Sequence, residues 1–246
     1  GFTQGSHLQA EFDITDYVNE GSNTLRVKVL KWCCGSYLED QDFFRYNGIF
    51  RDVYILQRPE NHITDVEMIP NDKTISIALQ GEAQVRIFDG ETLLMQTQMH
   101  ERFSYSPKEP KLWNAEKPYL YTLVIEEKGE FIPVKIGFRT QSVSQKGELL
   151  INGVPVKLFG VNHHDTSCTN GYTMTPDEIE KDVRLCKEYN IDTIRTSHYP
   201  PDPLLLEFCD ELGVYVVDEA DIETHGGFSQ QLPPNMGSLT QDKKWA

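Results

Sequence analysis

The sequence predicts a multidomain protein in which two β-rich regions precede the first part of a (β/α)8 TIM barrel. Two patterns support this prediction. Short alternations of apolar and polar residues, separated by turn residues, run through residues 1–141 and are typical of antiparallel sheets. After Thr140 the order becomes strand, helix, strand, helix, strand, with connections short enough to require parallel pairing. We therefore expect domains at residues 1–58, 59–141 and 142–246.

Composition narrows the class of protein. The chain has 246 residues and a net charge of -15, which argues against a nucleic-acid partner and suits a protein dissolved in the cytoplasm. Its five cysteines are odd in number and lack a paired-thiol zinc spacing, which predicts free thiols in a reducing compartment. No stretch approaches the roughly 20 apolar residues of a membrane span. We expect a cytoplasmic protein without membrane partners, whose sequence reads as cut at both ends.

The first region, residues 1–58, contains two strand-like runs. Leu25, Val27 and Val29 alternate with other residues in the first run, and residues 53–56 form the second. Residues 32–51 between them are rich in aromatic and acidic side chains. A loop this long inside a β domain is usually functional, although a surface loop anchored by Phe43 and Phe44 explains it equally well.

The second region, residues 59–141, predicts an immunoglobulin-like antiparallel β-sandwich. Asn71-Asp72 and Asp89-Gly90 are turn signals, and no cysteine is available to join the sheets. We interpret Trp113, Pro118 and Tyr119 as core and corner residues. No residue of this region is a candidate for catalysis. The expected strands are residues 63–69, 74–79, 83–88, 92–99, 120–126 and 131–136.

The third region, residues 142–246, opens with a predicted hairpin. Its arms are residues 148–151 and 154–159, joined by Asn152-Gly153, and the second arm continues into residues 160–165. Two helices and two strands follow. Thr175, Pro176 and Glu178 form a capping box at the first helix, whose predicted inner stripe contains Ile179, Val183, Cys186 and Asn190. The second helix starts at Asp202-Pro203, buries Leu204, Leu205, Phe208 and Leu212, and ends at Gly213; the strands are residues 191–195 and 214–217.

Polar, titratable residues end each predicted barrel strand. The clusters are His163, His164 and Asp165; Arg195, His198 and Tyr199; and Asp218, Glu219, Glu223 and His225. Carboxylates crowded at the end of a buried strand repel one another, so a metal ion is the leading candidate for their compensation. Structural residues would explain any one cluster equally well, but the carboxyl ends of barrel strands converge on one mouth, which favours a site. Only three of eight strands are visible, so we do not expect this part to fold stably alone.

With these residues in view, the sequence resembles the family 2 glycoside hydrolases, and within them the bacterial β-galactosidases. The matching segments are residues 35–42, 48–53, 110–113, 160–164, 197–200, 217–220 and 222–226. The resemblance implies the C-terminal part of a β jelly-roll sugar-binding domain at 1–58, the sandwich at 59–141 and the start of a catalytic barrel at 142–246.

The activity that the resemblance implies is retaining hydrolysis of terminal β-D-galactosides such as lactose, by two glutamates that both lie beyond this chain. The family tends to form homo-oligomers. Two alternatives remain: a non-catalytic carbohydrate-binding or structural module, and a sibling activity such as β-glucuronidase or β-mannosidase.

The resemblance also implies roles for individual residues. Glu223 and His225 match ligands of Mg²⁺, and Asp42 matches an aspartate that meets a galactose hydroxyl and Na⁺. His164 and His198 match histidines of the galactose pocket, and Arg195 matches an arginine beside the nucleophile. The family usually has arginine where His163 stands. A zinc amidohydrolase on the same barrel would instead show His-x-His after the first strand.

Overall fold

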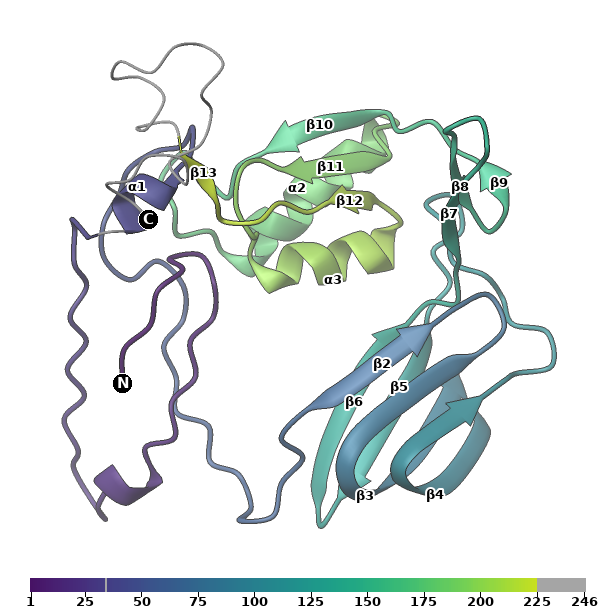
Figure 1. Cartoon of the computed structure of the whole chain (residues 1–246), viewed down its shortest axis with the longest axis horizontal. Helices are drawn as coiled ribbons and strands as arrows, with labels where there is room; N and C mark the ends of the chain where they lie inside the picture. Colours follow the sequence, from purple (N-terminus) through teal and green to yellow (C-terminus); the bar gives the residue numbers. More distant parts are fainter. Residues whose placement is uncertain (34, 225–246) are drawn as a thin grey trace.

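The computed structural model describes residues 1–33 and 35–224. Figure 1 shows extended N-terminal segments, a curled antiparallel sheet and a small parallel sheet with helices. The free cysteines are Cys33, Cys168, Cys186 and Cys209, as expected, and Cys34 lies outside the described residues. Within the described part of the chain, no helix has the length and apolar character needed to span a bilayer.

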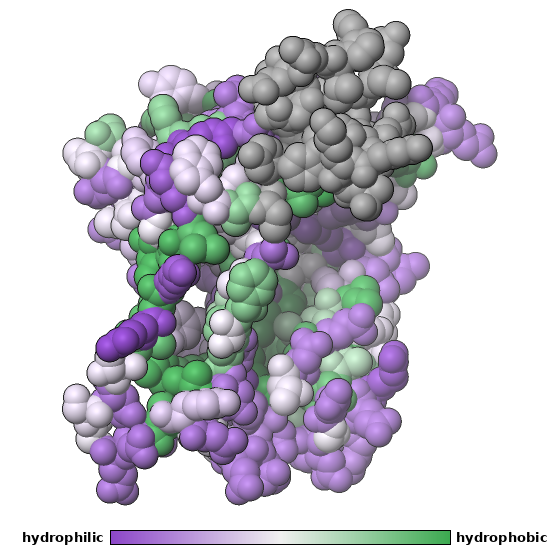
Figure 2. Space-filling model, turned by 60° about the vertical axis from the view of Figure 1, so that its left-hand side comes forward, coloured by the Kyte–Doolittle hydropathy of each residue, from purple (hydrophilic) through white to green (hydrophobic). Residues whose placement is uncertain are grey.

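The N-terminal region carries little regular structure. Its elements are the 3-10 helix η1 (Thr15–Tyr17), the short helix α1 (Gly35–Leu38) and strand β1 (Glu39–Asp40). The strands predicted at residues 25–29 and 53–56 are wrong for this structure, because both segments are extended without strand pairing. A strand completes its backbone hydrogen bonds only against a neighbouring strand. Side chains such as Val27 (55% exposed) and Ile55 (67% exposed) consequently face solvent, and Figure 2 shows hydrophobic residues exposed along this side.

The second region is a five-stranded antiparallel sheet. Its strands are β2 (Val66–Pro70), β3 (Ile75–Asp89), β4 (Thr92–Tyr105), β5 (Tyr121–Glu127) and β6 (Glu130–Ile136). Their order is β2-β3-β5-β6, and β4 also pairs with β3.

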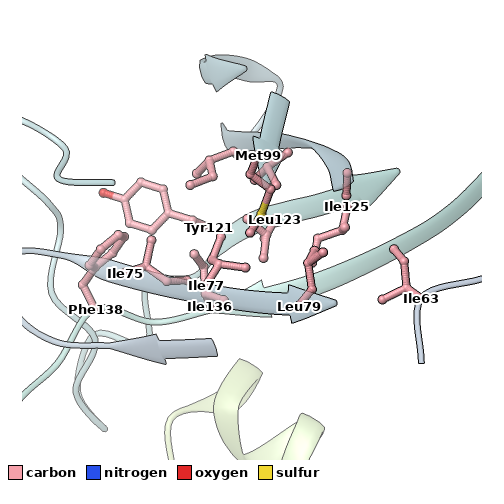
Figure 3. Packing of buried hydrophobic residues seen from close by; sticks show 13 residues of the cluster. Ile63, Ile75, Ile77, Leu79, Met99, Tyr121, Leu123, Ile125, Ile136 and Phe138 are labelled. Carbon is pink, nitrogen blue, oxygen red and sulfur yellow. The ribbon is translucent and has the colours of Figure 1, made fainter. Parts of the chain in front are cut away.

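Strand β3 gives this sheet its curl. Two separate strands were predicted over this segment, but β3 continues through them with a register shift between Ala78 and Glu82, where Gly81 has a φ of +93°. The first part of β3 pairs with β2 and the later part with β5. Alternate residues of β3 point inward, including Ile75, Ile77 and Val85, and they form the core drawn in Figure 3.

A three-stranded sheet leads to the barrel. It consists of β7 (Gln141–Val143), β8 (Leu149–Ile151) and β9 (Val154–Pro155). The predicted turn is confirmed, because Asn152 and Gly153 join β8 to β9 with φ values of +52° and +77°. The second arm is shorter than predicted: β9 ends at Pro155, and the first barrel strand starts separately at Gly160.

The barrel region is a parallel sheet in the order β10 (Gly160–His163), β11 (Thr193–Thr196) and β12 (Tyr215–Val217). Helices α2 (Pro176–Glu188) and α3 (Pro203–Leu212) lie on one side of it in Figure 1. The predicted inner faces are confirmed for Ile179, Val183, Cys186 and Leu205, which are buried, and Leu204, Phe208 and Leu212 pack against them. Asn190 lies beyond α2 with a left-handed φ of +57°, so its predicted place in the stripe is wrong.

Candidate active site

The parallel register brings the ends of the three barrel strands to one edge of the sheet. Asn162 pairs with Arg195, and Arg195 pairs with Val217, so the residues that follow each strand start at one level. The predicted clusters therefore approach one another.

His198 lies at the centre of a polar network at this edge. Its Nδ1 atom is 3.2 Å from Nη2 of Arg195, 3.3 Å from Oε2 of Glu219 and 3.7 Å from Oε2 of Glu223. Arg195 donates from Nε to Oε1 of Glu219 over 2.5 Å. One guanidinium and two carboxylates thus surround one imidazole, and these contacts fix the direction of its ring.

His164 lies beside this network. Its ring centroid is 5.8 Å from that of His198, and its Nδ1 is 3.3 Å from the hydroxyl oxygen of Tyr199. Burial lowers the pKa of His164, nearby His198 and His163 lower it further, and the Asp42 carboxylate acts in the opposite direction. Phe43, the residue after Asp42, packs against Tyr199, so the residue 32–51 loop approaches the pocket.

The loop is held against the barrel by backbone pairing. Strand β1 pairs in parallel with β13 (Glu223–Thr224), with Glu39 opposite Glu223. In Figure 1, α1 and β13 lie side by side. Phe43 packs among aromatic rings, with its centroid 5.8 Å from Tyr199, whereas Phe44 is 61% exposed and is no anchor.

His7 joins the N-terminal region to the barrel, and nothing in the sequence indicated it. Its side chain is 4% exposed, and its ring stacks on Tyr199 with centroids 4.2 Å apart. Its Nδ1 lies 3.1 Å from both carboxylate oxygens of Asp221. Burial raises the pKa of Asp221, but hydrogen bonds from His7 and Gln41 outweigh it and hold the pKa below the ordinary value.

Arg51 forms a second connection between the same regions. It donates from Nη1 to the His7 carbonyl over 2.7 Å, and from Nη2 to Oδ2 of Asp165 and the Pro200 carbonyl over 3.1 Å each. Asp165 also accepts from the Asp202 backbone N–H over 2.7 Å. These contacts give Asp165 a structural role, although it belongs to the first predicted cluster.

Known proteins match this architecture along its length. Three models of glycosyl hydrolases family 2 match the chain. The sugar binding domain matches residues 1–59, the model described simply as glycosyl hydrolases family 2 matches residues 60–139, and the TIM barrel domain matches residues 143–246. The chain belongs to glycosyl hydrolase family 2. Its fold is accordingly a sugar-binding region, an immunoglobulin-like domain and the start of a TIM barrel.

Curated relatives in this family include two β-galactosidases. The one from Actinobacillus pleuropneumoniae is 43% identical over 239 residues, covering 92% of this chain and 24% of the relative. The one from Pseudoalteromonas haloplanktis is 39% identical, covering 100% of this chain and 26% of the relative. The chain thus spans about a quarter of the length of these relatives.

Solved structures that are similar to this chain include β-glucuronidases. That of Faecalibacterium prausnitzii has a TM-score of 0.68 and 29% identity, covering 73% of this chain and 31% of its own. Apo β-glucuronidase 3 of Bacteroides uniformis has a TM-score of 0.67 and 26% identity, and the match covers 75% of this chain and 26% of that structure's chain.

Two residues of the predicted clusters have hydrogen-bond partners outside the His198 network. Nε2 of His163 is 3.0 Å from Oδ2 of Asp182 on α2, so this imidazole links β10 to the helix. Asp218 accepts a hydrogen bond from Oγ1 of Thr196 over 3.2 Å. The adjacent His163 and His164 have different partners, Asp182 and Tyr199.

Of the two predicted magnesium ligands, the structure describes Glu223. His225 lies outside the described residues, and among residues 1–33 and 35–224 no three His, Cys, Asp or Glu side chains form a metal-binding group. The carboxylates of Glu219 and Glu223 near His198 supply the oxygen donors that a hard cation prefers, so the donor chemistry fits Mg²⁺.

Proposed function

We propose that this chain is part of a retaining β-galactosidase that hydrolyses terminal β-D-galactosides such as lactose. The observation that carries the proposal is the meeting of His164, His198 and Glu223 at one end of the barrel, beside the loop that holds Asp42. Identities of 37–43% to curated β-galactosidases support the same assignment.

Each residue has a chemical role in this proposal. His164 is a neutral imidazole that can exchange hydrogen bonds with a sugar hydroxyl, since its lowered pKa disfavours the charged form. His198 offers a second imidazole, oriented by Arg195 and Glu219. Asp42 accepts a hydrogen bond from a sugar hydroxyl. Double displacement needs an acid/base and a nucleophile about 5 Å apart, and we assign both to glutamates of the parent protein beyond this chain.

We further propose that Glu223 and His225 hold Mg²⁺ and that Asp42 contributes to a Na⁺ site. A divalent ion beside the acid/base carboxyl would set its position and pKa. The test is the melting temperature of the full-length parent during titration with MgCl₂ after treatment with a chelator. We expect Mg²⁺ to raise the melting temperature of the parent but not of the Glu223→Gln variant. An equal rise in both proteins would refute this assignment.

A sibling activity is the second candidate, because the solved structures above are β-glucuronidases. The higher identity to curated β-galactosidases, 43% for that of Actinobacillus pleuropneumoniae against 29% for the β-glucuronidase of Faecalibacterium prausnitzii, favours a galactoside as the substrate. Turnover of a nitrophenyl β-galactoside against the matching β-glucuronide decides between them. The binding-module alternative predicts sugar binding by calorimetry without turnover of either substrate.

The decisive experiment uses Asp42→Ala and His198→Ala in the full-length parent. We expect each to lower kcat/KM for the β-galactoside by roughly 100-fold, since each removes a hydrogen bond to the sugar. The matched controls are Asp65→Ala and His100→Ala, which change exposed side chains of the immunoglobulin-like domain. Unchanged kinetics in both site variants would contradict the proposed pocket.

Location and assembly complete the proposal. The free thiols agree with a reducing cytoplasm. We propose a cytoplasmic homo-oligomer, to be tested by cell fractionation and by light scattering of the purified parent.

A further inference from the structure

The carboxylate of Asp221 receives hydrogen bonds from two distant parts of the sugar-binding region. The His7 backbone N–H donates to Oδ2 over 3.2 Å, and the His7 ring lies 3.1 Å from both oxygens. The side-chain amide of Gln41 donates to Oδ1. The Asp221 side chain is only 5% exposed and Gln41 is 2% exposed, so these bonds lie in the interior.

The same contacts fix both neighbours of Asp42. Gln41 is tied to Asp221, and the backbone N–H of Phe43 donates to the Gln41 carbonyl over 3.0 Å, which makes a tight turn around Asp42. The Phe43 ring packs edge-on against His7, with centroids 5.6 Å apart. Asp42 itself is exposed, so its anchored neighbours restrict where its carboxylate can lie.

We propose that Asp221, acting through Gln41 and His7, is a positioning residue that holds Asp42 in the sugar pocket. The inference rests on the proposed contact between Asp42 and the sugar. The physical reason is preorganisation: a carboxylate on a loose loop must be ordered whenever substrate binds, whereas an anchored one is already in place. The pairing of β1 with β13 covers only two residues of each strand and leaves Asp42 just outside it, so it does not by itself fix the turn.

The test is Gln41→Met in the full-length parent. Methionine has a similar volume, so it removes the amide donor to Asp221 without opening a large cavity. We expect the KM for the β-galactoside to rise roughly tenfold and kcat to stay within about threefold, since sugar binding is weakened before the chemical step. Arg58→Ala is the control: it breaks the 2.7 Å bond to Oε1 of Glu130, far from the pocket, and should leave KM unchanged.

The double variant Gln41→Met/Asp42→Ala distinguishes positioning from general stability. If Gln41 acts through Asp42, the double variant has the same KM as Asp42→Ala alone. If the rise in KM of the double variant equals the product of the two single rises, the inference is overturned. An unchanged KM in Gln41→Met would overturn it as well. Either result would leave the proposed function intact. An unchanged KM in Asp42→Ala would overturn both.

A second substitution keeps the test decisive if Gln41→Met does not fold. Asp221→Asn retains one acceptor oxygen, so we expect a smaller rise in KM than in Asp221→Ala. Equal effects of these two substitutions would contradict a role through hydrogen bonding.

Discussion

Neighbouring side chains at the strand ends perform different tasks. His163 turns to Asp182 on α2, whereas His164 lies beside His198 and Tyr199 at the pocket. The two imidazoles are adjacent in sequence, and successive residues at the end of a strand point to opposite sides. Of these two imidazoles, only His164 therefore lies at the pocket.

The environment of His164 predicts its titration. Burial, with His198 and His163 nearby, lowers its pKa below the ordinary value of 6.5. Histidine NMR should therefore show His164 titrating below that value. Because the unfolded chain binds this proton more readily, the stability linked to His164 is lost as pH falls below about 6.5. His164→Gln should flatten the pH dependence of the melting temperature in this window, and an unaltered slope would contradict the buried, neutral imidazole.

Helix α2 shows how local sequence alone specifies an element. Oγ1 of Thr175 accepts from the Glu178 backbone N–H, and the Glu178 carboxylate accepts from the Thr175 backbone N–H over 2.9 Å. Pro176 supplies a first residue whose backbone already has a helical φ. The start of this helix depends on contacts within four consecutive residues.

We expect Thr175→Ala to lower the free energy of unfolding by about 1 kcal/mol, because the variant loses the side-chain acceptor at the helix start. The measurement is urea denaturation of the purified full-length parent and its variant. Thr173→Ala, which changes an exposed threonine just before the cap, should have little effect. Equal losses in both variants would argue against the capping box.

At the scale of the whole molecule, a set of polar contacts joins the immunoglobulin-like domain to the barrel. Nε1 of Trp113 donates to the Asp210 carbonyl over 2.7 Å, and Nζ of Lys187 donates to the carbonyls of Ala115 and Gly213 over 2.8 Å each. Gly213 ends α3 with a φ of +79°, and a Cβ there would lie 2.4 Å from the Ala115 carbonyl oxygen. This glycine serves both the helix end and the domain contact.

Gly213→Ala should consequently cost more than the same change at Gly147. Gly147 has a similar φ of +81°, but a Cβ added there would have no atom within 4 Å, so this position isolates the backbone strain, about 1 kcal/mol. At Gly213 the clash with Ala115 should add roughly 2 kcal/mol, measured as a difference in unfolding free energy by urea denaturation. Equal losses of unfolding free energy at Gly213 and Gly147 would mean that disrupting the domain contact at Gly213 has no cost.

Local patterns in the sequence determined much of this protein. The caps of α2 and α3, the Asn152-Gly153 turn and the alternation of β3 depend on neighbouring residues, so they could be predicted. The clustering of His164, Arg195 and His198 could be predicted as well, because parallel strands must end at one edge.

Tertiary structure alone decided which polar residues face the pocket and which join the domains. His7 and Asp221 are 214 residues apart, and no local pattern relates them. Residues 25–29 have the alternation of a strand but remain unpaired in this structure, because a strand depends on a partner as well as on its own sequence. Contacts between distant segments depend on how the whole chain packs, which is why only the three-dimensional arrangement revealed them.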